Sequence, residues 1–171
     1  MTTAQLDDID RQILHLLQRD ARMTNAAIAA EVGLTGPSVF ERIRKLEQRG
    51  VIRGYTINID PAALGKPMTA FIRLVAAFDD RYDSGLKAIG EDPDVLECYN
   101  VAGEDCLVLK IKCGSPSDLE SLLGRIRSRL TVQRSVTMIA LRALKENAPL
   151  NVLPRTEKPA VRRRAKARLE G

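Results

Sequence analysis

The chain has 171 residues, of which 27 are lysine or arginine and 22 are aspartate or glutamate, and its formal net charge is +5. This length allows one sizeable hydrophobic core or two small ones. No apolar run approaches the roughly 20 residues that a membrane-spanning helix needs. The acidic start MTTAQLDDIDRQ also lacks the basic-then-apolar pattern of a signal peptide, so we expect a cytoplasmic location and no membrane partner.

The positive charge is concentrated at the C-terminal end. Residues 1–149 contain 20 Lys/Arg and 20 Asp/Glu, whereas residues 150–171 contain seven and two. The overall basic charge therefore does not by itself indicate that the folded part binds nucleic acid. The three cysteines, Cys98, Cys106 and Cys113, form no C-x-x-C pair. This spacing supports neither a zinc site nor a disulfide framework, and we expect reduced thiols, no metal site and no cofactor.

The first 60 residues predict three short helices. Apolar residues recur at helical spacing in each of them. Thr24 and Thr35 stand where they can cap the second and third helices, and Gly50 ends the third. The predicted inward residues are Ile9, Ile13, Leu16 and Leu17 in the first helix, Ala27, Ile28 and Val32 in the second, and Val39, Ile43 and Leu46 in the third.

The turn and the segment that flank the third helix define the N-terminal domain. The glycine-containing turn GLTG before that helix describes a helix-turn-helix. Residues 51–60, VIRGYTINID, alternate in β-branched residues, which predicts a short wing strand or hairpin. We therefore predict a winged helix-turn-helix over residues 5–60, followed by a linker at residues 61–67, PAALGKP.

Beyond the linker, strand and helix patterns alternate in the order β-α-β-β-α-β. This order is the ferredoxin-like split motif, a four-stranded antiparallel sheet with helices on one face. Apolar residues such as Phe71 and Ile139 make a bare second face unfavourable, which implies a partner subunit. The fold class is therefore α+β, with this domain at residues 68–148 and a basic, disordered tail predicted for residues 149–171. The predicted strands are residues 68–78, 94–101, 105–113 and 132–144, and the predicted helices are residues 82–92 and 116–130.

The third helix carries basic residues on its outward side. On a 100° period Ser38, Arg42 and Lys45 share one side, while Glu41 and Arg44 lie on another outward strip. Arginine can hold guanine O6 and N7 with two donors or pair with phosphate. A solvated basic face would explain an isolated R-x-R-K pattern equally well, but the two preceding helices, the turn and the following GVIRGY favour double-stranded DNA as a partner. The predicted DNA-binding residues are Thr35, Gly36, Pro37, Ser38, Glu41, Arg42, Arg44, Lys45 and Arg53.

Four stretches, in this order, resemble the Lrp/AsnC family, the leucine-responsive or feast/famine regulators. The likeness covers about residues 5–148. It implies a sequence-specific DNA-binding transcriptional regulator and not an enzyme. It also implies that the C-terminal domain dimerises, often assembles into octamers, and senses an amino acid or related small metabolite. The stretches are LDDIDRQILHLLQRDAR, GLTGPSVFERIRKLEQRGVIRGYTINIDPAALG, VLECYNVAGEDCLVLKI and SVTMIALRALKE.

In this family the effector pocket generally lies near the loop between the second and third strands and the start of the last strand. Gly103 matches the family glycine, and Glu104 matches the first acidic residue of the common G-D-x-D pattern. Asp105 falls where an aromatic residue often stands, and Cys106 replaces the second aspartate. On the residues alone, AGEDC is equally well a hairpin turn with Gly103 at positive φ. The implied effector-binding residues, which include two hydroxyls on the last strand, are Gly103, Glu104, Asp105, Cys106, Ser135 and Thr137.

Two other function classes stay open on the sequence. A nucleoid-type architectural protein would wrap DNA with little specificity, and the basic tail suits that role. An enzyme is less favoured, although siroheme decarboxylases resemble the same architecture. That chemistry is expected to need histidines in the C-terminal pocket, whereas the single histidine, His15, belongs to the first predicted helix. No catalytic residue is therefore predicted.

Overall fold

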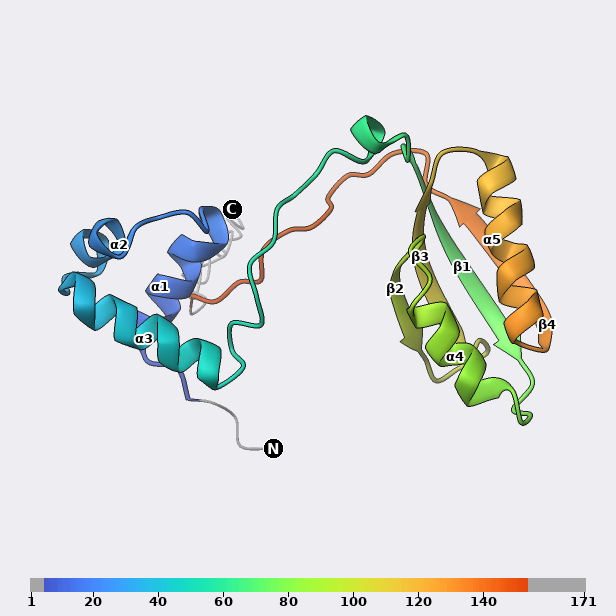
Figure 1. Ribbon diagram of the computed structural model, residues 1–171, viewed down its shortest axis with the longest axis horizontal. Coiled ribbons are helices and arrows are strands. Elements are labelled where there is room, and N and C mark those ends of the chain that lie inside the picture. Colours follow the sequence, from blue (N-terminus) through green and yellow to red (C-terminus); the bar gives the residue numbers. More distant parts are fainter. Residues whose placement is uncertain (1–4, 154–171) are drawn as a thin grey trace, which may run out of the picture. The chain divides into compact units, whose positions relative to one another are not determined.

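The computed structural model describes residues 5–153 of the chain, and Figure 1 shows its elements. Contacts divide the chain into two units, with the boundary after Thr56. Of the described residues, 147–153 belong to the first unit, and residues 57–146 form the second. Of the predicted tail, residues 154–171 lie outside the described residues. Within residues 5–153, no helix is long and apolar enough to cross a membrane.

The N-terminal unit is built from three helices, as predicted. Thr24 Oγ1 accepts a hydrogen bond from the Ala27 amide at the start of α2, so the predicted cap is confirmed. Gly33 ends α2 with a φ of 69°, a left-handed conformation that glycine adopts without a steric penalty. The helices are α1 (Asp8–Arg19), α2 (Asn25–Val32) and α3 (Gly36–Gln48). Their shared core contains Ile13, Ile28, Ala29 and Val39, with Ile9, Leu16, Leu17, Met23, Val32, Leu34 and Ile43 packed against it.

The predicted wing is wrong for the described chain. Residues 53–60 contain neither a strand nor a helix, and Tyr55, Ile57 and Ile59 are exposed. An alternating pattern records which side chains face the same way, but a strand also needs a hydrogen-bonded neighbouring strand. In the described chain, strand pairing is confined to the sheet of the second unit. Among its described residues, the first unit is therefore a helix-turn-helix without a wing strand.

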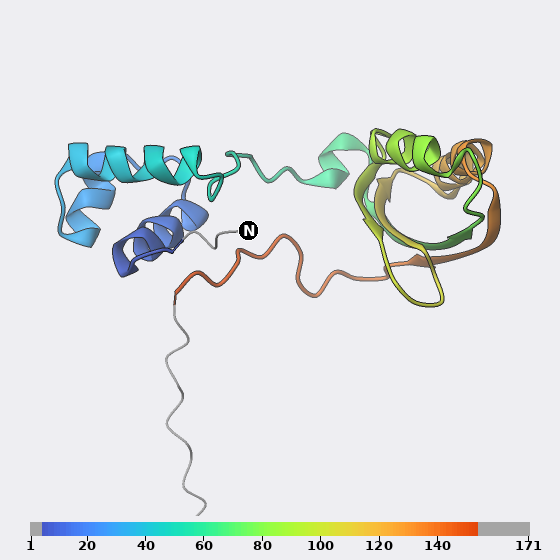
Figure 2. The same ribbon diagram turned by 90° about the horizontal axis from the view of Figure 1, so that it is seen from below.

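The second unit has the predicted ferredoxin-like topology. Its four strands pair antiparallel in the order β2-β3-β1-β4, and the two helices lie on the same face of the sheet (Figures 1 and 2). The predicted linker forms a short 3-10 helix, η1 (Pro61–Leu64), before β1. The remaining elements are β1 (Met68–Ala76), α4 (Tyr82–Gly90), β2 (Val95–Asn100), β3 (Leu107–Cys113), α5 (Pro116–Arg129) and β4 (Val132–Ile139).

The two faces of this sheet differ in burial. Alternate residues of β1 and β3, such as Ile72 and Leu109, are fully buried beneath the helices. On the other face, Phe71 lies opposite Met138, and both remain exposed. We call this side the open sheet face; by strand register it carries Phe71, Arg73, Tyr99, Val108, Lys110, Val136 and Met138.

The register corrects one expectation about this face. Ile139 pairs with Ala70, which is buried beneath the helices, so Ile139 points to the helix-covered side. It is nevertheless 48% exposed, because it stands at the end of the edge strand β4. Phe71 therefore shares the open sheet face with Val136 and Met138 and not with Ile139.

Candidate nucleic-acid interface and effector region

Helix α3 is held to the first unit by one buried side and by its capped start. Val39 and Leu46 are fully buried, and Ile43 is partly buried against the same cluster, which confirms the predicted inward face. Thr35 Oγ1 accepts from the Ser38 amide at 3.4 Å, and the two hydroxyl oxygens lie 2.8 Å apart. These contacts satisfy donors at the helix start that have no partner within the helix.

The outward side of α3 exposes most of the predicted DNA-binding residues. Glu41 and Arg44 form an exposed ion pair of 3.2 Å one turn apart, and a pair of this kind contributes little to stability. Lys45 is exposed and makes no ion pair within residues 5–153. Gly36 is half-buried in the first turn. Exposed as well are Thr35, Pro37, Ser38 and Arg53.

Arg42 differs from its neighbours, because its guanidinium is engaged inside the unit. Its Nη1 donates to Asp7 Oδ2 at 2.7 Å and to Asp10 Oδ1 at 2.8 Å. These hydrogen bonds raise the pKa of Arg42. The pKa of Asp7 is lowered, first by the hydrogen bond from the Asp10 amide and then by Arg42. Arg42 was predicted to contact a base or a phosphate, whereas in the structure it lies between two carboxylates.

In the predicted effector region, Asp105 is occupied by two arginines. Arg73 Nε donates to Asp105 Oδ2 at 2.6 Å, and Arg134 Nη2 lies 3.3 Å from Oδ1. The Asp105 side chain is only 9% exposed. Arg73 is in β1 and Arg134 is in β4, and the side chains of both are on the open sheet face. Asp105 therefore neutralises cations of its own chain, which leaves little of it for the ammonium group of a ligand.

Cys106 lies in the hydrophobic core of the second unit and is not a surface residue of the loop. Its thiol donates to the Leu74 carbonyl at 3.3 Å and accepts from the Ala76 amide at 3.2 Å. Both partners belong to β1. The predicted strand 105–113 included Cys106, but β3 begins at Leu107, so strand alternation does not apply to Cys106 and its thiol points inward beside the side chain of the buried Leu107. Cys106 is therefore not placed to contact an effector, which corrects that expectation.

The other predicted effector residues are divided between the two sides of the sheet. Ser135 lies opposite Leu74 and Thr137 opposite Ile72, so both hydroxyls share the helix-covered side. Glu104 is exposed. Gly103 has a φ of 145°, as expected for a turn that requires glycine. The structure therefore brings Gly103, Glu104 and Asp105 together in one loop, apart in facing direction from the two hydroxyls.

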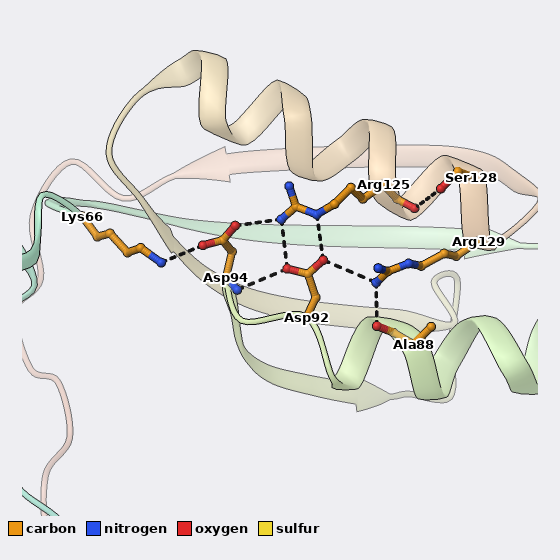
Figure 3. A network of polar contacts seen from close by, with 7 residues as sticks. All are labelled: Lys66, Ala88, Asp92, Asp94, Arg125, Ser128 and Arg129. Carbon is orange, nitrogen blue, oxygen red and sulfur yellow. Dashed lines mark hydrogen bonds and ion pairs between the residues drawn. The ribbon is translucent and has the colours of Figure 1, made fainter.

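A polar network in the second unit was not predicted (Figure 3). Asp92 has a 3% exposed side chain and accepts from Arg125 Nε at 2.8 Å and Nη2 at 2.9 Å. Arg125 also donates to Asp94 at 2.7 Å, and Lys66 reaches Asp94 at 2.7 Å. Arg129 joins through Asp92 at 3.4 Å. The network thus fixes the turn after α4 to α5 and to the end of the linker.

The basic residues of this network lower the pKa of both of its aspartates. The hydrogen bond from Arg125 lowers the pKa of Asp92. Hydrogen bonds from Lys66 and then from Arg125 lower the pKa of Asp94 and outweigh its burial, which acts to raise it. A weak sequence signal existed, because two aspartates two residues apart precede β2 and two arginines stand one turn apart on α5. A hollow of about 270 Å³ lies beside the network, lined in part by Lys66 and Arg125. Among the described residues, no cluster of three or more His, Cys, Asp or Glu could hold a metal ion.

A helix-turn-helix that exposes a basic third helix, joined in one chain to a ferredoxin-like sheet, defines a class of two-domain DNA-binding regulators. Comparison with known proteins identifies the same class. Residues 6–47 match the AsnC-type helix-turn-helix domain, and residues 69–150 match the Lrp/AsnC ligand binding domain. The chain belongs to the Lrp/AsnC family, and it is an HTH-type transcriptional regulator.

Relatives and solved structures agree with this assignment. HTH-type transcriptional regulator LrpA of Mycobacterium tuberculosis is 37% identical over 134 residues, which are 78% of this chain and 89% of the relative. An AsnC family transcriptional regulator from Agrobacterium tumefaciens has a TM-score of 0.80 at 25% identity and covers 85% of this chain and 96% of its own. Transcriptional regulator NMB0573 of Neisseria meningitidis, solved as an L-Met complex, has a TM-score of 0.79 at 26% identity and covers 86% and 98%.

Proposed function

We propose that this regulator reads DNA by placing α3 in the major groove. The observation that carries the proposal is that α3 buries Val39 and Leu46 while Ser38, Glu41 and Lys45 remain exposed on its outer side. Lysine can contact guanine or phosphate, serine can donate or accept, and glutamate can accept from cytosine. Arg44 and Arg53 and the turn at residues 35–37 would contact the backbone, which fixes the register of the protein on the duplex.

Sequence specificity is tested by the ratio of two affinities. A duplex selected in vitro by the protein and a random duplex of the same length are titrated at one stated salt concentration. A specific regulator should bind the selected duplex about 10³-fold more tightly or better. Equal affinities would instead support an architectural protein that wraps DNA through phosphate contacts alone.

We also propose that the regulator responds to an amino acid or a related small metabolite. The match to the ligand binding domain supports it, as does the neighbour solved with L-Met. The amides of the Gly103 turn would hold a carboxylate, and Glu104 would meet an ammonium group. Because Ser135 and Thr137 face the helix-covered side of the sheet, their hydroxyls would contribute only to a site on that side. Calorimetry with the twenty amino acids tests this, and heat from none of them would argue for a regulator without a sensor.

Assembly follows from the open sheet face in the same proposal. Phe71, Tyr99, Val136 and Met138 are between 37% and 55% exposed on that face, and contiguous apolar area of this kind marks an interaction surface. A second copy supplies matching apolar side chains through a two-fold axis. We propose at least a homodimer, with an octamer as the family's larger assembly, acting in the cytoplasm.

A further inference from the structure

The position of Arg42 on α3 does not match its contacts. Its place in the helix puts it on the same side as Ser38 and Lys45, which the proposed function directs toward DNA. Its Nη1 instead donates to both Asp7 and Asp10, at 2.7 and 2.8 Å. Its side chain is 32% exposed, and that of Asp10 is 10% exposed. We call these three residues the α1–α3 clamp.

The clamp links the first turn of α1 to the middle of α3. Asp7 serves both helices, because its Oδ1 caps α1 by accepting from the Asp10 amide at 2.7 Å while its Oδ2 accepts from Arg42. Arg49 adds a second connection, since its Nη2 donates to the Gln5 carbonyl at 2.9 Å. Residues 5–10 are therefore held along one side of α3 by two arginines about two turns apart.

Turning the Arg42 side chain away from Asp7 and Asp10 toward DNA would be energetically unfavourable. Two charge-assisted hydrogen bonds would have to break, and the nearly buried carboxylate of Asp10 would lose its cation. An uncompensated charge in such a place is strongly unfavourable. Lys45, one turn further along the same side, carries no such cost, because it forms no ion pair in the described part of the chain.

We propose that Arg42 is a positioning residue that fixes the orientation of α3 relative to α1. Ser38, Glu41 and Lys45 then make the base contacts. The inference rests on the proposed entry of α3 into the major groove. Small displacements of a recognition helix weaken all of its base contacts together, because each hydrogen bond tolerates little change in length and angle. The clamp would thus act on specificity through geometry, without its own base contact.

The test measures the ratio of affinities for the selected and random duplexes, and the preference at each base pair of the selected duplex. The variants are Arg42→Ala, Arg42→Lys, the double variant Asp7→Asn with Asp10→Asn, and the triple variant that combines the double with Arg42→Ala. Asparagine keeps the cap on α1 and leaves Arg42 in place. Circular dichroism at the assay temperature confirms that every variant is folded, and Lys45→Ala is the base-contact control.

A positioning role predicts that Arg42→Ala and the double variant each lower the ratio by roughly tenfold, which corresponds to about 1.4 kcal/mol. The triple variant should lower the ratio no further than Arg42→Ala or the double variant does. Arg42→Lys should lower it less than Arg42→Ala. In all variants, the order of base preference at each position should stay the same. Loss of preference at a single G·C pair in Arg42→Ala, or a double variant that binds the selected duplex as well as the wild type, would overturn the inference alone. A wild type without any preference would overturn the proposed function and this inference with it.

Discussion

Asp92 is the buried acid around which the polar network of the second unit is arranged. Because Arg125 lowers its pKa in the folded state, Asp92 binds protons more weakly when folded than when unfolded, where its pKa is about 3.9. Its contribution to the free energy of unfolding is therefore fully present above that value and is lost as the pH falls through the lower, folded pKa.

We expect Asp92→Asn to lower the free energy of unfolding by about 2–3 kcal/mol at pH 7. Between pH 5 and pH 2, the free energy of unfolding should fall less in the variant than in the wild type. Urea denaturation followed by circular dichroism over this range measures both effects. Lys66→Met is the control, because this lysine is 42% exposed and its removal should cost less than about 1 kcal/mol. An unchanged pH profile in Asp92→Asn would contradict the role given to this acid.

At the scale of single residues, the sequence predicted what depends on near neighbours. The caps by Thr24 and Thr35 were both predicted, and each accepts the expected amide hydrogen bond. The partners of Arg42 and Asp105 were not predicted, because each lies about 30 residues or more away in sequence. Such pairs depend on how whole elements pack, and no periodicity records them.

At the scale of elements, Gly85 of α4 packs directly against the end of α5. A Cβ at this position would lie 2.5 Å from both the Arg129 carbonyl oxygen and Leu130 Cδ2. Gly124 of α5 offers a comparison, since a Cβ there would have no atom within 4 Å. The absence of a side chain thus has a packing reason at Gly85 that it lacks at Gly124.

We predict that Gly85→Ala lowers the free energy of unfolding by about 1–3 kcal/mol through overpacking. Gly124→Ala should raise it by about 0.5–1 kcal/mol, because alanine loses less backbone entropy in a helix. Thermal and urea unfolding of both variants give these differences. Equal effects of the two substitutions would mean that α4 and α5 do not pack as described.

The ends of the elements show where sequence patterns stop being informative. The helix predicted at residues 116–130 is observed at Pro116–Arg129, because its cap and its apolar stripe are both local signals. The last strand was predicted to reach residue 144 but ends at Ile139. Ile139 pairs with Ala70, only two residues from the start of β1 at Met68. Residues 141–144 therefore have almost no part of β1 left to pair with.

At the scale of the whole molecule, the open sheet face decides the proposed assembly. Phe71 stands near its centre, opposite Lys110 on β3 and Met138 on β4. In a two-fold dimer each copy would bury this ring, and burial of a phenylalanine contributes about 1.5–3 kcal/mol. A carboxylate in its place would also have to be desolvated.

Phe71→Glu should therefore raise the dimer dissociation constant by roughly a hundredfold or more, since 1.4 kcal/mol corresponds to tenfold. Sedimentation velocity at micromolar concentration measures the change. Phe78→Glu is the matched control, because Phe78 is 79% exposed and its ring packs at a tilt against that of Tyr82, the first residue of α4. Wild-type protein that sediments as a monomer, or equal dissociation in both variants, would exclude the open sheet face as the interface.

The central claim is that the exposed side of α3 recognises DNA sequence, and Lys45→Ala tests it most directly. Lys45 is exposed, so its removal should leave thermal unfolding unchanged. The dissociation constant for the selected duplex is measured for wild type and variant beside that for random DNA. We predict a loss of about 1–3 kcal/mol in binding to the selected duplex, with relaxed preference at one base pair and a smaller loss on random DNA. Equal losses on both duplexes, or no loss on either, would contradict recognition by this side of α3.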